Sequence, residues 1–417
     1  MTQTTMVPTD VAATGGPSLR ERAIALAPAI AARAQEVDEQ RFVHEETIEE
    51  LHEAGLFRAY QPKAYGGDEA SPEDLVAATI EIAKACPSTA WVLIILNVHH
   101  WEMAHMSKQL QDELWADDPR TLISSSYASQ GTARPVDGGY IVTGRWRSSS
   151  GVVHSKWAII GADVEVDGRT VPHNFVVPLN EATVLDDWYV LGMCGTGSRS
   201  VVVEEVFVPS HRVIDREVML AMAGPGLREN TAPLFRIPQG ILFSPVAGAP
   251  AIGAGWAFYN GFREVAKKYV RRLDNLTLSQ DRGTFVRVAE TRASLMDQER
   301  NLLRTMAEAE RQAISGQEAS AAELAIAMYD ISRGARVALD VAEELMPLLG
   351  PAAVYRTNPL TRLYRDLITA RQHATQNPEL YAPPVGNMEL GNEGTNFFIL
   401  SDEAAAAARE RGQRTYG

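Results

Sequence analysis

His373 is the residue of this sequence whose surroundings carry the most chemical information. It follows the pair Arg365-Asp366 by seven residues, in a segment that starts at Asn358 and has a helical pattern of apolar residues. A helix that continues to His373 would place its imidazole on the same face as Asp366. An imidazole titrates near neutral pH and can take the proton of a bound hydroxyl group. Without its neighbours, His373 would be interpreted as a solvated histidine at a helix end.

A second segment whose residues could take part in chemistry consists of a turn, a strand and a run of serines. The turn Gly138-Gly139 begins an alternating pattern that leads to Trp146, and the run Ser148-Ser149-Ser150-Gly151 follows. Such a run commonly forms a polar turn, while its hydroxyls can also bond to a ligand. From the residues alone, the polar turn is the favoured interpretation.

The loop Gly195-Thr196-Gly197-Ser198 precedes a strand rich in valine. It is not a dinucleotide-binding fingerprint, because in that motif the glycines follow a strand and lead into a helix. By itself the loop is typical of a hairpin turn. No glycine motif of the nicotinamide-binding type occurs in the sequence, so we expect no tight NAD(P)H site.

The pair His99-His100 lies near the end of an apolar helical segment that starts near Ser88. Adjacent helical positions point about 100° apart, so only one of the two histidines can face a site. We choose His99 and keep His100 as the alternative, with capping of a buried helix as the non-functional explanation. The serines Ser124 to Ser126 begin the first expected strand.

Three regions with different residue patterns must position these residues. The pattern is helical over about 18–114, changes to short alternating strands over about 121–213, and is helical again from about 247. Long helices are expected at 287–315 and 320–349, the second with a capping box formed by Ser320 and Glu323. The fold class is therefore α+β, mostly α.

The order helices, strands, helices, together with these motifs, resembles the acyl-CoA dehydrogenase fold. The match is most specific in the segments Trp146 to Trp157 and Asn358 to His373, and within that fold it resembles the oxygenase components of two-component flavin-dependent aromatic hydroxylases. His373 stands where dehydrogenases carry a glutamate base. The composition of residues 1–16 indicates a flexible leader. The expected domains are an N-terminal helical domain at 17–118, a β domain at 119–215, and a helical bundle and tail at 216–417, of which the tail beyond His373 lies outside the resemblance.

The resemblance also implies roles for individual residues. Ser150 would bond to flavin N5 and prolong a C4a-hydroperoxyflavin, which loses peroxide once N5 loses its proton. His373 and His99 would complete the catalytic group, with His373 activating a phenol. Flavin contacts are expected from Trp146, Ser149, Ser150, Thr196, Gly197 and Ser198, and substrate contacts from His99, His100, Ser125 and Ser126. Ser148 replaces a bulky aromatic residue of the family, which puts that contact in doubt.

The function implied is hydroxylation of a small phenolic substrate with O2 and reduced flavin, FMNH2 or FADH2, supplied by a separate NAD(P)H:flavin reductase. A homotetramer is implied, and no metal. The alternatives are an N-oxygenase of an amino sugar or amine, an acyl-CoA dehydrogenase, and a flavin-binding assembly protein. Glu393-Gly394-Thr395 resembles the dehydrogenase base motif but falls some twenty residues too late after Arg365-Asp366. Arg362, Arg365 and Arg371 could bind flavin phosphate, and structural ion pairing is favoured for Arg365.

Composition limits the partners and the compartment. A formal charge of -14 and a pI near 5.2 disfavour nucleic acid and anionic membranes, which repel an acidic surface. The two cysteines, Cys86 and Cys194, have no metal-ligand spacing and fit a reducing compartment. The first nineteen residues lack Lys, Arg and an apolar stretch, so no signal peptide is indicated. We expect a cytoplasmic protein.

Overall fold

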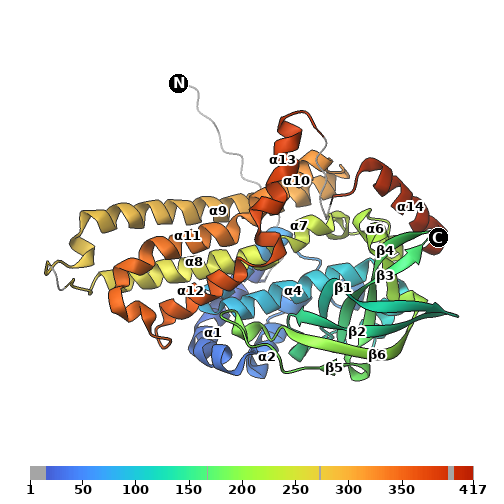
Figure 1. Ribbon diagram of the computed structural model, residues 1–417, viewed down its shortest axis with the longest axis horizontal. Helices are drawn as coiled ribbons and strands as arrows, with labels where there is room; N and C mark the ends of the chain where they lie inside the picture. Colours follow the sequence, from blue (N-terminus) through green and yellow to red (C-terminus); the bar gives the residue numbers. More distant parts are fainter. Residues whose placement is uncertain (1–15, 167, 272–273, 393–398, 417) are drawn as a thin grey trace.

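The computed structural model describes residues 16–166, 168–271, 274–392 and 399–416 of the 417-residue chain. Helices come first, a β-sheet follows, and a second set of helices ends the chain, as the residue patterns predicted (Figure 1). Glu393, Gly394 and Thr395 lie outside the described residues. The α+β class with a predominance of helix is thereby confirmed.

Five helices precede the sheet. Their bounds are α1 Leu19–Gln40, α2 Glu45–Glu53, α3 Pro72–Ala85, α4 Pro87–Ala104 and α5 Lys108–Trp115. Helix α4 is buried along its whole length, from a proline at its first position to Ala104. In Figure 1 it runs from the helical end of the molecule toward the sheet, so side chains on α4 can reach both.

The sheet has seven strands in the order β5-β6-β2-β1-β3-β4-β7, and all neighbours pair antiparallel except β1 with β3. The strands are β1 Ile123–Val136, β2 Gly139–Ser149, β3 Trp157–Val166, β4 Arg169–Pro178, β5 Thr183–Val184, β6 Arg199–Pro209 and β7 Val213–Asp215. Register shifts interrupt β1 between Ser126 and Gly131 and β2 between Trp146 and Ser149. Such irregularities re-aim side chains at the end of a strand.

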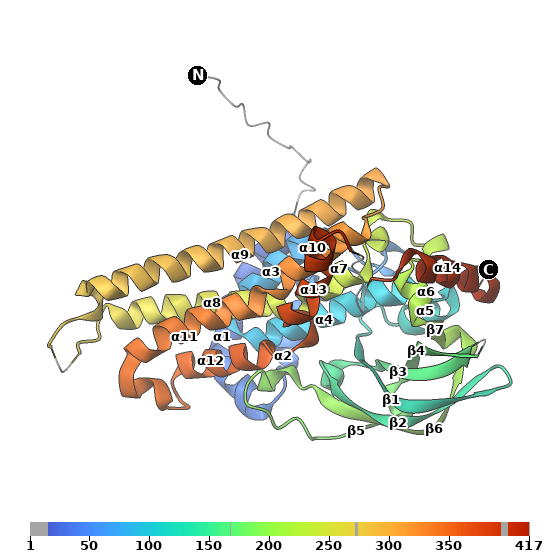
Figure 2. The ribbon, with the colours of Figure 1, turned by 45° about the horizontal axis from the view of Figure 1, so that its top comes forward.

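The helices after the sheet form a bundle and a separate C-terminal element. They are α6 Arg216–Leu220, α7 Gln239–Phe243, α8 Pro245–Ala266, α9 Arg282–Ser315, α10 Ala321–Ser332, α11 Gly334–Leu345, α12 Pro359–Ala370, α13 Pro378–Glu389 and α14 Asp402–Tyr416. Figure 2 shows α8, α9, α11 and α12 stacked beside one another, away from the sheet.

Two expectations about this bundle need adjustment. The capping box of Ser320 and Glu323 is confirmed at the start of α10. The single helix expected over 320–349 is instead two helices, which meet at Arg333 and Gly334. A Cβ on Gly334 would lie 3.3 Å from Gly248 of α8, so this bend brings the chain close to the neighbouring helix.

The C-terminal helix α14 packs on α6 and the edge of the sheet. The Arg411 guanidinium bonds to Asp215 at 2.9 Å and to Glu217 at 2.5 Å, and the hydroxyl of Tyr416 accepts from the Asp215 amide at 3.1 Å. The Ala-rich composition of this region had indicated only a tail.

Among the described residues, one stretch is long and apolar enough to cross a membrane. It covers Gln239–Ala266, and 89% of its most apolar window is buried inside the protein. Core helices of globular proteins pass the same test when, as here, their apolar surface faces other helices.

Candidate active site

One face of α4 carries the polar and aromatic residues of the candidate site. Trp91, Ile95, His99 and Glu102 follow one another at intervals of three and four residues, which places them on one side of the helix. All four are nearly or completely buried. This face turns toward β1 and the beginning of the helical bundle, where the remaining site residues lie.

Ser150 stands at the start of a chain of hydrogen bonds that ends in a backbone carbonyl. The Trp91 indole N–H donates to Ser150 Oγ at 3.2 Å, and Ser150 Oγ lies 2.8 Å from Ser198 Oγ. Ser198 Oγ lies 2.7 Å from Thr196 Oγ1, which donates to the carbonyl of Met193 at 2.9 Å. Three of the four hydroxyls predicted to contact flavin are therefore brought together.

The two ends of this chain fix the direction of its protons. The Thr196 proton is committed to the Met193 carbonyl, so Ser198 donates to Thr196 and Ser150 donates to Ser198. The indole N–H of Trp91 occupies one lone pair of Ser150 Oγ. What remains at Ser150 is a single acceptor position, which suits a ligand that presents an N–H group.

Two of the residues predicted to bind flavin lie outside this chain of hydroxyls. Trp146 is fully buried inside the sheet, where its indole N–H donates to the Gly161 carbonyl at 2.7 Å. A Cβ on Gly131 would lie 2.2 Å from its ring, so the glycine there makes room for Trp146. The expected flavin contact of Trp146 is therefore wrong, because its ring has no surface left for a ligand. Ser149 is also fully buried, and its hydroxyl has no partner among the described residues.

Gly197 shapes the loop that carries Thr196 and Ser198. Its φ of +55° is a left-handed conformation that glycine adopts without strain. The loop is also tied to α12, because the Asp366 carboxylate accepts from the Met193 amide at 2.5 Å. Burial raises the pKa of Asp366 to about 7. Asp366 thus positions the loop that carries Thr196 and Ser198, which we call the flavin-side loop after its expected role.

Arg365 itself forms the structural ion pair that was favoured. Its guanidinium bonds to Asp38 of α1 at 2.8 Å and to the Leu191 carbonyl at 2.8 Å. The partner is Asp38 instead of the adjacent Asp366. Arg371 donates to the Gln376 carbonyl at 2.8 Å, which stabilises the turn after α12.

His373 does not lie on α12, which ends at Ala370. It follows the helix in an extended conformation and caps the short turn Ala374–Gln376. The expectation of a continuous helical face was wrong, because the chain leaves the helix at Arg371. The turn nevertheless brings the imidazole against the ring of Trp91, with centroids 5.2 Å apart.

The contacts of His373 define its protonation. Burial lowers its pKa to about 4, so the ring is neutral near pH 7. The backbone N–H of Thr375 donates to Nδ1 at 3.3 Å, and the Thr375 hydroxyl lies 2.8 Å from the same atom. Because Nδ1 accepts a hydrogen bond, the proton of the neutral ring belongs on Nε2.

Aromatic rings connect His373 with His99 in an arc. Phe243 of α7 lies 6.2 Å from the His373 ring and 5.5 Å from the ring of Tyr127, and Tyr127 lies 6.2 Å from the ring of His99. Together with Trp91 these side chains come from α4, β1, α7 and the turn after α12. The arc joins the hydroxyl chain at one end to His99 at the other.

His99, not His100, lies in this arc. The Nδ1–H of His99 donates to the Ile123 carbonyl at 2.5 Å, so its Nε2 carries a lone pair, and that atom is buried without a partner. Burial lowers its pKa to about 3, so the ring stays neutral. His100 points away, toward Trp115 and the carbonyl of Thr121.

The two serines of β1 that were expected to bind substrate lie on opposite faces of the strand. Ser125 alternates with Tyr127 on the face of β1 that packs on α4, and its hydroxyl lies in a position to donate to the Tyr127 phenol oxygen. Ser126 belongs to the other face, where its hydroxyl donates to the Arg147 carbonyl at 2.7 Å. Of the two serines expected to bind substrate, only Ser125 faces the arc.

The sequence reasoning missed Trp91, Tyr127 and Phe243. Trp91 lies two helical turns before His99, so the helical period of α4 already placed both on one face. Tyr127 was detectable as the residue two positions beyond Ser125 on the same strand face. Nothing in the sequence pointed to Phe243, which reaches the site through the packing of α7.

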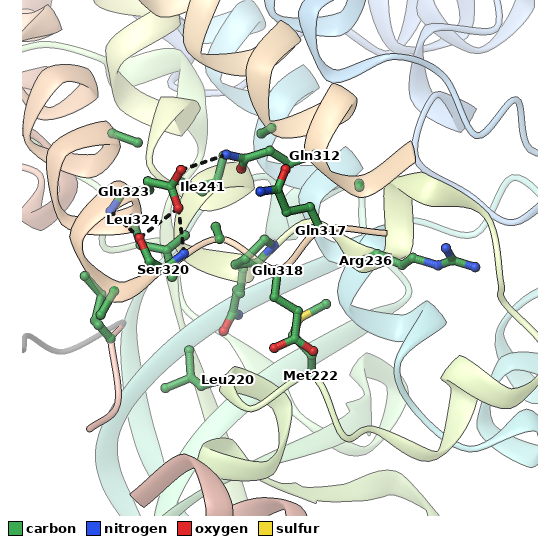
Figure 3. A pocket seen from close by; sticks show the side chains of 18 of the residues that line it. Leu220, Met222, Arg236, Ile241, Gln312, Gln317, Glu318, Ser320, Glu323 and Leu324 are labelled. Atoms are coloured by element: carbon green, nitrogen blue, oxygen red, sulfur yellow. Dashed lines mark hydrogen bonds between the residues drawn. The ribbon is translucent and has the colours of Figure 1, made fainter. Parts of the chain in front are cut away.

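A cavity of about 1070 Å³ opens beside this arc. Figure 3 shows its wall, in which Gln312, Ser320 and Glu323 are joined by hydrogen bonds. Neither His373 nor Ser150 lines it, so it is not the site itself. The wall includes Gln239 and Ile241 of α7, the helix that also carries Phe243.

Comparison with known proteins places these features in context. Residues 18–116 match the family model "Acyl-CoA dehydrogenase, N-terminal domain", and residues 245–378 match "Acyl-CoA dehydrogenase, C-terminal domain". The chain is 36% identical to the flavin-dependent monooxygenase oxygenase subunit HsaA of Rhodococcus jostii (strain RHA1), over 91% of this chain and 100% of that protein.

Two further relatives carry information about ligands. The oxygenase component of p-hydroxyphenylacetate 3-hydroxylase from Acinetobacter baumannii is 29% identical, over 91% of this chain and 90% of that protein. The structure of XiaF from Streptomyces sp. in complex with FADH2 and glycerol is 28% identical. It superposes with a TM-score of 0.84, covering 90% of this chain and 96% of XiaF.

Proposed function

This chain belongs to the oxygenase subunits of flavin-dependent monooxygenases, on the acyl-CoA dehydrogenase fold, and we propose that it hydroxylates a small phenolic substrate. Reduced flavin, when bound, supplies the electrons that activate O2 for transfer of one oxygen atom. The single observation that carries the proposal is the arc of side chains between the hydroxyl chain of Ser150 and the unpaired nitrogen of His99.

The hydroxyl chain fits a reduced flavin better than an oxidised one. N5 of reduced flavin bears a hydrogen and donates, whereas N5 of oxidised flavin only accepts. Ser150 has one acceptor position left, because its own proton is committed to Ser198. We propose that Ser150, Ser198 and Thr196 hold the N5 edge of reduced flavin, with Gly197 shaping the loop. Ser149 is kept as a candidate contact, since its buried hydroxyl lacks a partner.

The opposite end of the arc suits a phenol. His99 Nε2 is a buried acceptor, and the rings of Tyr127 and Phe243 provide apolar walls for an aromatic ring. A phenol hydroxyl that donates to His99 would place electron density on its ring, which favours attack on an electrophilic oxygen. The named substrate of the p-hydroxyphenylacetate relative is a phenol, which supports this class.

For His373 the structure changes the proposed role. A base must present a lone pair, but the contacts of Nδ1 put the proton on Nε2, which has no partner among the described residues. We therefore propose that neutral His373 donates from Nε2 to oxygen in the site. The earlier hypothesis of a base requires the other tautomer, in which Nδ1–H donates to the Thr375 hydroxyl.

Further parts of the proposal rest on the relatives. The name "oxygenase subunit" supports a separate reductase that delivers the flavin. The FADH2 in XiaF supports reduced flavin, and we propose that FMNH2 or FADH2 serves here with O2 and without a metal. A cytoplasmic homotetramer with the domain limits given above completes the proposal.

The decisive experiment mixes the protein anaerobically with reduced FMN or FAD and then with O2 in a stopped-flow spectrometer. We expect a long-lived near-ultraviolet transient before oxidised flavin appears, and a ring-hydroxylated product when a phenol is present. Oxidation at the rate of free flavin would contradict the proposed function. A product that carries a hydroxylamine group would identify an N-oxygenase.

Substitution of Ser198 tests the direction of the hydrogen bonds among the hydroxyls proposed to hold the flavin. In Ser198→Ala the Ser150 proton loses its partner and can donate to N5 of oxidised flavin. We expect the preference for reduced over oxidised flavin to fall about tenfold, the usual worth of one hydrogen bond near 1.4 kcal/mol. Anaerobic and aerobic titrations measure the two dissociation constants.

The matched control is Ser129→Ala, which removes an exposed hydroxyl bonded to Asp163 on the same sheet. It should leave the preference for reduced flavin unchanged. An unchanged preference in Ser198→Ala would show that the hydroxyl chain does not set the redox state of the bound flavin.

A further inference from the structure

Glu102 is a buried carboxylate that the proposed reaction does not use. It is fully buried on the site face of α4, one turn beyond His99. Its Oε2 accepts from the Tyr127 hydroxyl at 2.6 Å, and its Oε1 accepts from the side-chain amide of Gln239. Arg216 of α6 lies with its guanidinium 5.7 Å from the Tyr127 ring centroid and balances part of the charge.

The Glu102 carboxylate accepts hydrogen bonds from the donors around it. The single proton of Tyr127 is directed to Glu102, so the phenol oxygen can only accept from Ser125. The amide N–H2 of Gln239 is likewise directed to Glu102, and its carbonyl oxygen is buried without a partner. The protons in this network therefore all run toward Glu102.

The atoms of this network that remain available to a ligand are hydrogen-bond acceptors. Ser125 keeps its lone pairs, His99 presents an unpaired Nε2, and Gln239 presents an unpaired Oε1. Gln239 also lines the cavity of about 1070 Å³, so the network borders that cavity. An unpaired buried acceptor is unfavourable unless a ligand brings a donor.

We propose that Glu102 is a positioning residue for substrate selection: by orienting Tyr127, Ser125 and Gln239 it leaves only acceptors at the His99 end of the site. The site thereby selects aromatic substrates with neutral hydroxyl groups, and rejects ethers and carboxylates at the same position. This inference rests on the proposed function and goes beyond it by naming the feature of the substrate that is recognised.

The network explains why a carboxylate is needed, because an amide at position 102 would itself donate one hydrogen bond. The hydrogen bond from one neighbouring side chain would then have to reverse its direction, and the Ser125 hydroxyl would become free to donate to the ligand. Protonation of Glu102 has the same effect. The charged or titratable groups that face Glu102 are Tyr127 of β1 and Arg216 of α6, with the neutral Gln239 of α7.

The test compares the binding of two probes of similar shape, 2-naphthol and 2-methoxynaphthalene, to protein that holds reduced flavin under anaerobic conditions. Wild-type protein should bind 2-naphthol at least tenfold more tightly than the ether. In Tyr127→Phe the Ser125 proton is released and can donate to the ether oxygen. We expect the ratio of the two dissociation constants to fall about tenfold.

The control is Tyr65→Phe, which removes an equivalent hydrogen bond far from the site. Tyr65 donates to Asp112 at 2.6 Å, the same length as the bond from Tyr127 to Glu102. The ratio should be unchanged in this variant. A merely structural role of Tyr127 would weaken both probes equally and leave their ratio as in the wild type.

The pH dependence gives a second readout. Burial raises the pKa of Glu102 to about 7, so the ratio should fall as the pH decreases through 7. In Glu102→Gln the ratio should be low at every pH. Glu73→Gln should keep the dependence, although burial also raises the pKa of Glu73, which lies in the first turn of α3. His99 and His373 stay neutral in this range.

The inference is overturned if the ratio is unchanged in Tyr127→Phe, or if wild-type protein does not bind 2-naphthol. It is likewise overturned if the ratio is independent of pH in the wild type. None of these measurements requires turnover, so they are separate from the stopped-flow experiment. Failure to form the near-ultraviolet transient would contradict the proposed function, whereas an unchanged ratio would contradict only the role of Glu102.

Discussion

Individual protons, more than individual residues, determine what this site can bind. Around Ser150 and around Glu102, the donors have assigned acceptors, and acceptor positions remain for a ligand. His373 differs, since its Nε2–H is a donor without a partner among the described residues. The site therefore offers acceptors at its two ends and one donor between them, which matches a reduced flavin, a phenol and an oxygen atom.

His373→Leu tests the donor between the two ends. Because leucine has no N–H group, we expect the yield of hydroxylated product per flavin oxidised to fall about a hundredfold, within the usual range for loss of one preorganised donor. Binding of reduced flavin should change little. The measurement is product analysis after a single turnover with a phenol.

Two variants serve as controls for His373. His173→Gln removes another buried histidine, which lies in the sheet and bonds to Val171. It should retain the wild-type yield. Thr375→Val keeps the backbone N–H that bonds to Nδ1, so it should change the yield less than threefold. A large loss in Thr375→Val would support the tautomer of the base hypothesis.

At the scale of the elements, the site depends on how closely the flavin-side loop approaches α12. A Cβ added to Gly192 would lie 2.2 Å from the Arg365 carbonyl oxygen, and one added to Gly195 would lie 2.2 Å from Val37. The amide of Met193 also bonds to Asp366. Helices α1 and α12 therefore hold Thr196 and Ser198 in register with Ser150.

Gly192→Ala should displace this loop, because backbone atoms of α12 cannot move aside as a flexible side chain would. We expect reduced flavin to bind at least tenfold more weakly and the midpoint of thermal unfolding to fall. Gly283→Ala is the control: its Cβ would meet only the Asp281 carboxylate, at 3.3 Å, near the start of α9. Equal flavin affinity in both variants would contradict the role of the loop.

For the whole molecule, buried histidines dominate the dependence of stability on pH. Seven of the nine histidines have a lowered pKa because of burial, and that of His99 and of His105 falls to about 3. In the unfolded chain they titrate near 6.5. Their contribution to stability is present above this pH and is lost as the pH falls toward the folded values.

We therefore expect the midpoint of thermal unfolding to be several degrees lower at pH 5 than at pH 7. Each excess proton bound by the unfolded state removes ~1.4 kcal/mol per pH unit. Glu102 and Asp366 act in the opposite sense, since their raised pKa values favour the folded state at lower pH, but the histidines outnumber them. Scanning calorimetry across this range makes the measurement.

Substitution of one buried histidine, compared with substitution of a less buried one, tests this explanation. His105 is fully buried with both ring nitrogens unpaired, so His105→Phe should flatten the pH dependence. His211 is only partly buried and bonds to Glu113, so His211→Gln should leave the pH dependence unchanged. A midpoint that is equal at pH 5 and pH 7 would show that other groups cancel the histidines.

The sequence by itself determined the order of helices and strands, the family, and the capping box of Ser320 and Glu323. Each of these depends on residues close together in the chain, whose periodicity and spacing express local backbone preferences. Ser150 and Ser198 were also singled out in this way, because they belong to local motifs. Helical geometry determined only that one of His99 and His100 can face a site, and the tertiary structure placed His99 in the arc.

Only the tertiary structure decided how the site is assembled. Trp146 proved to be a core residue and His373 a turn residue, since burial and helix termination depend on what the segment packs against. Phe243, Tyr127 and Glu102 come together from α7, β1 and α4, which are distant in the sequence. No local pattern encodes such contacts, and the direction of the protons, which depends on every partner at once, became visible only when all of them were in place.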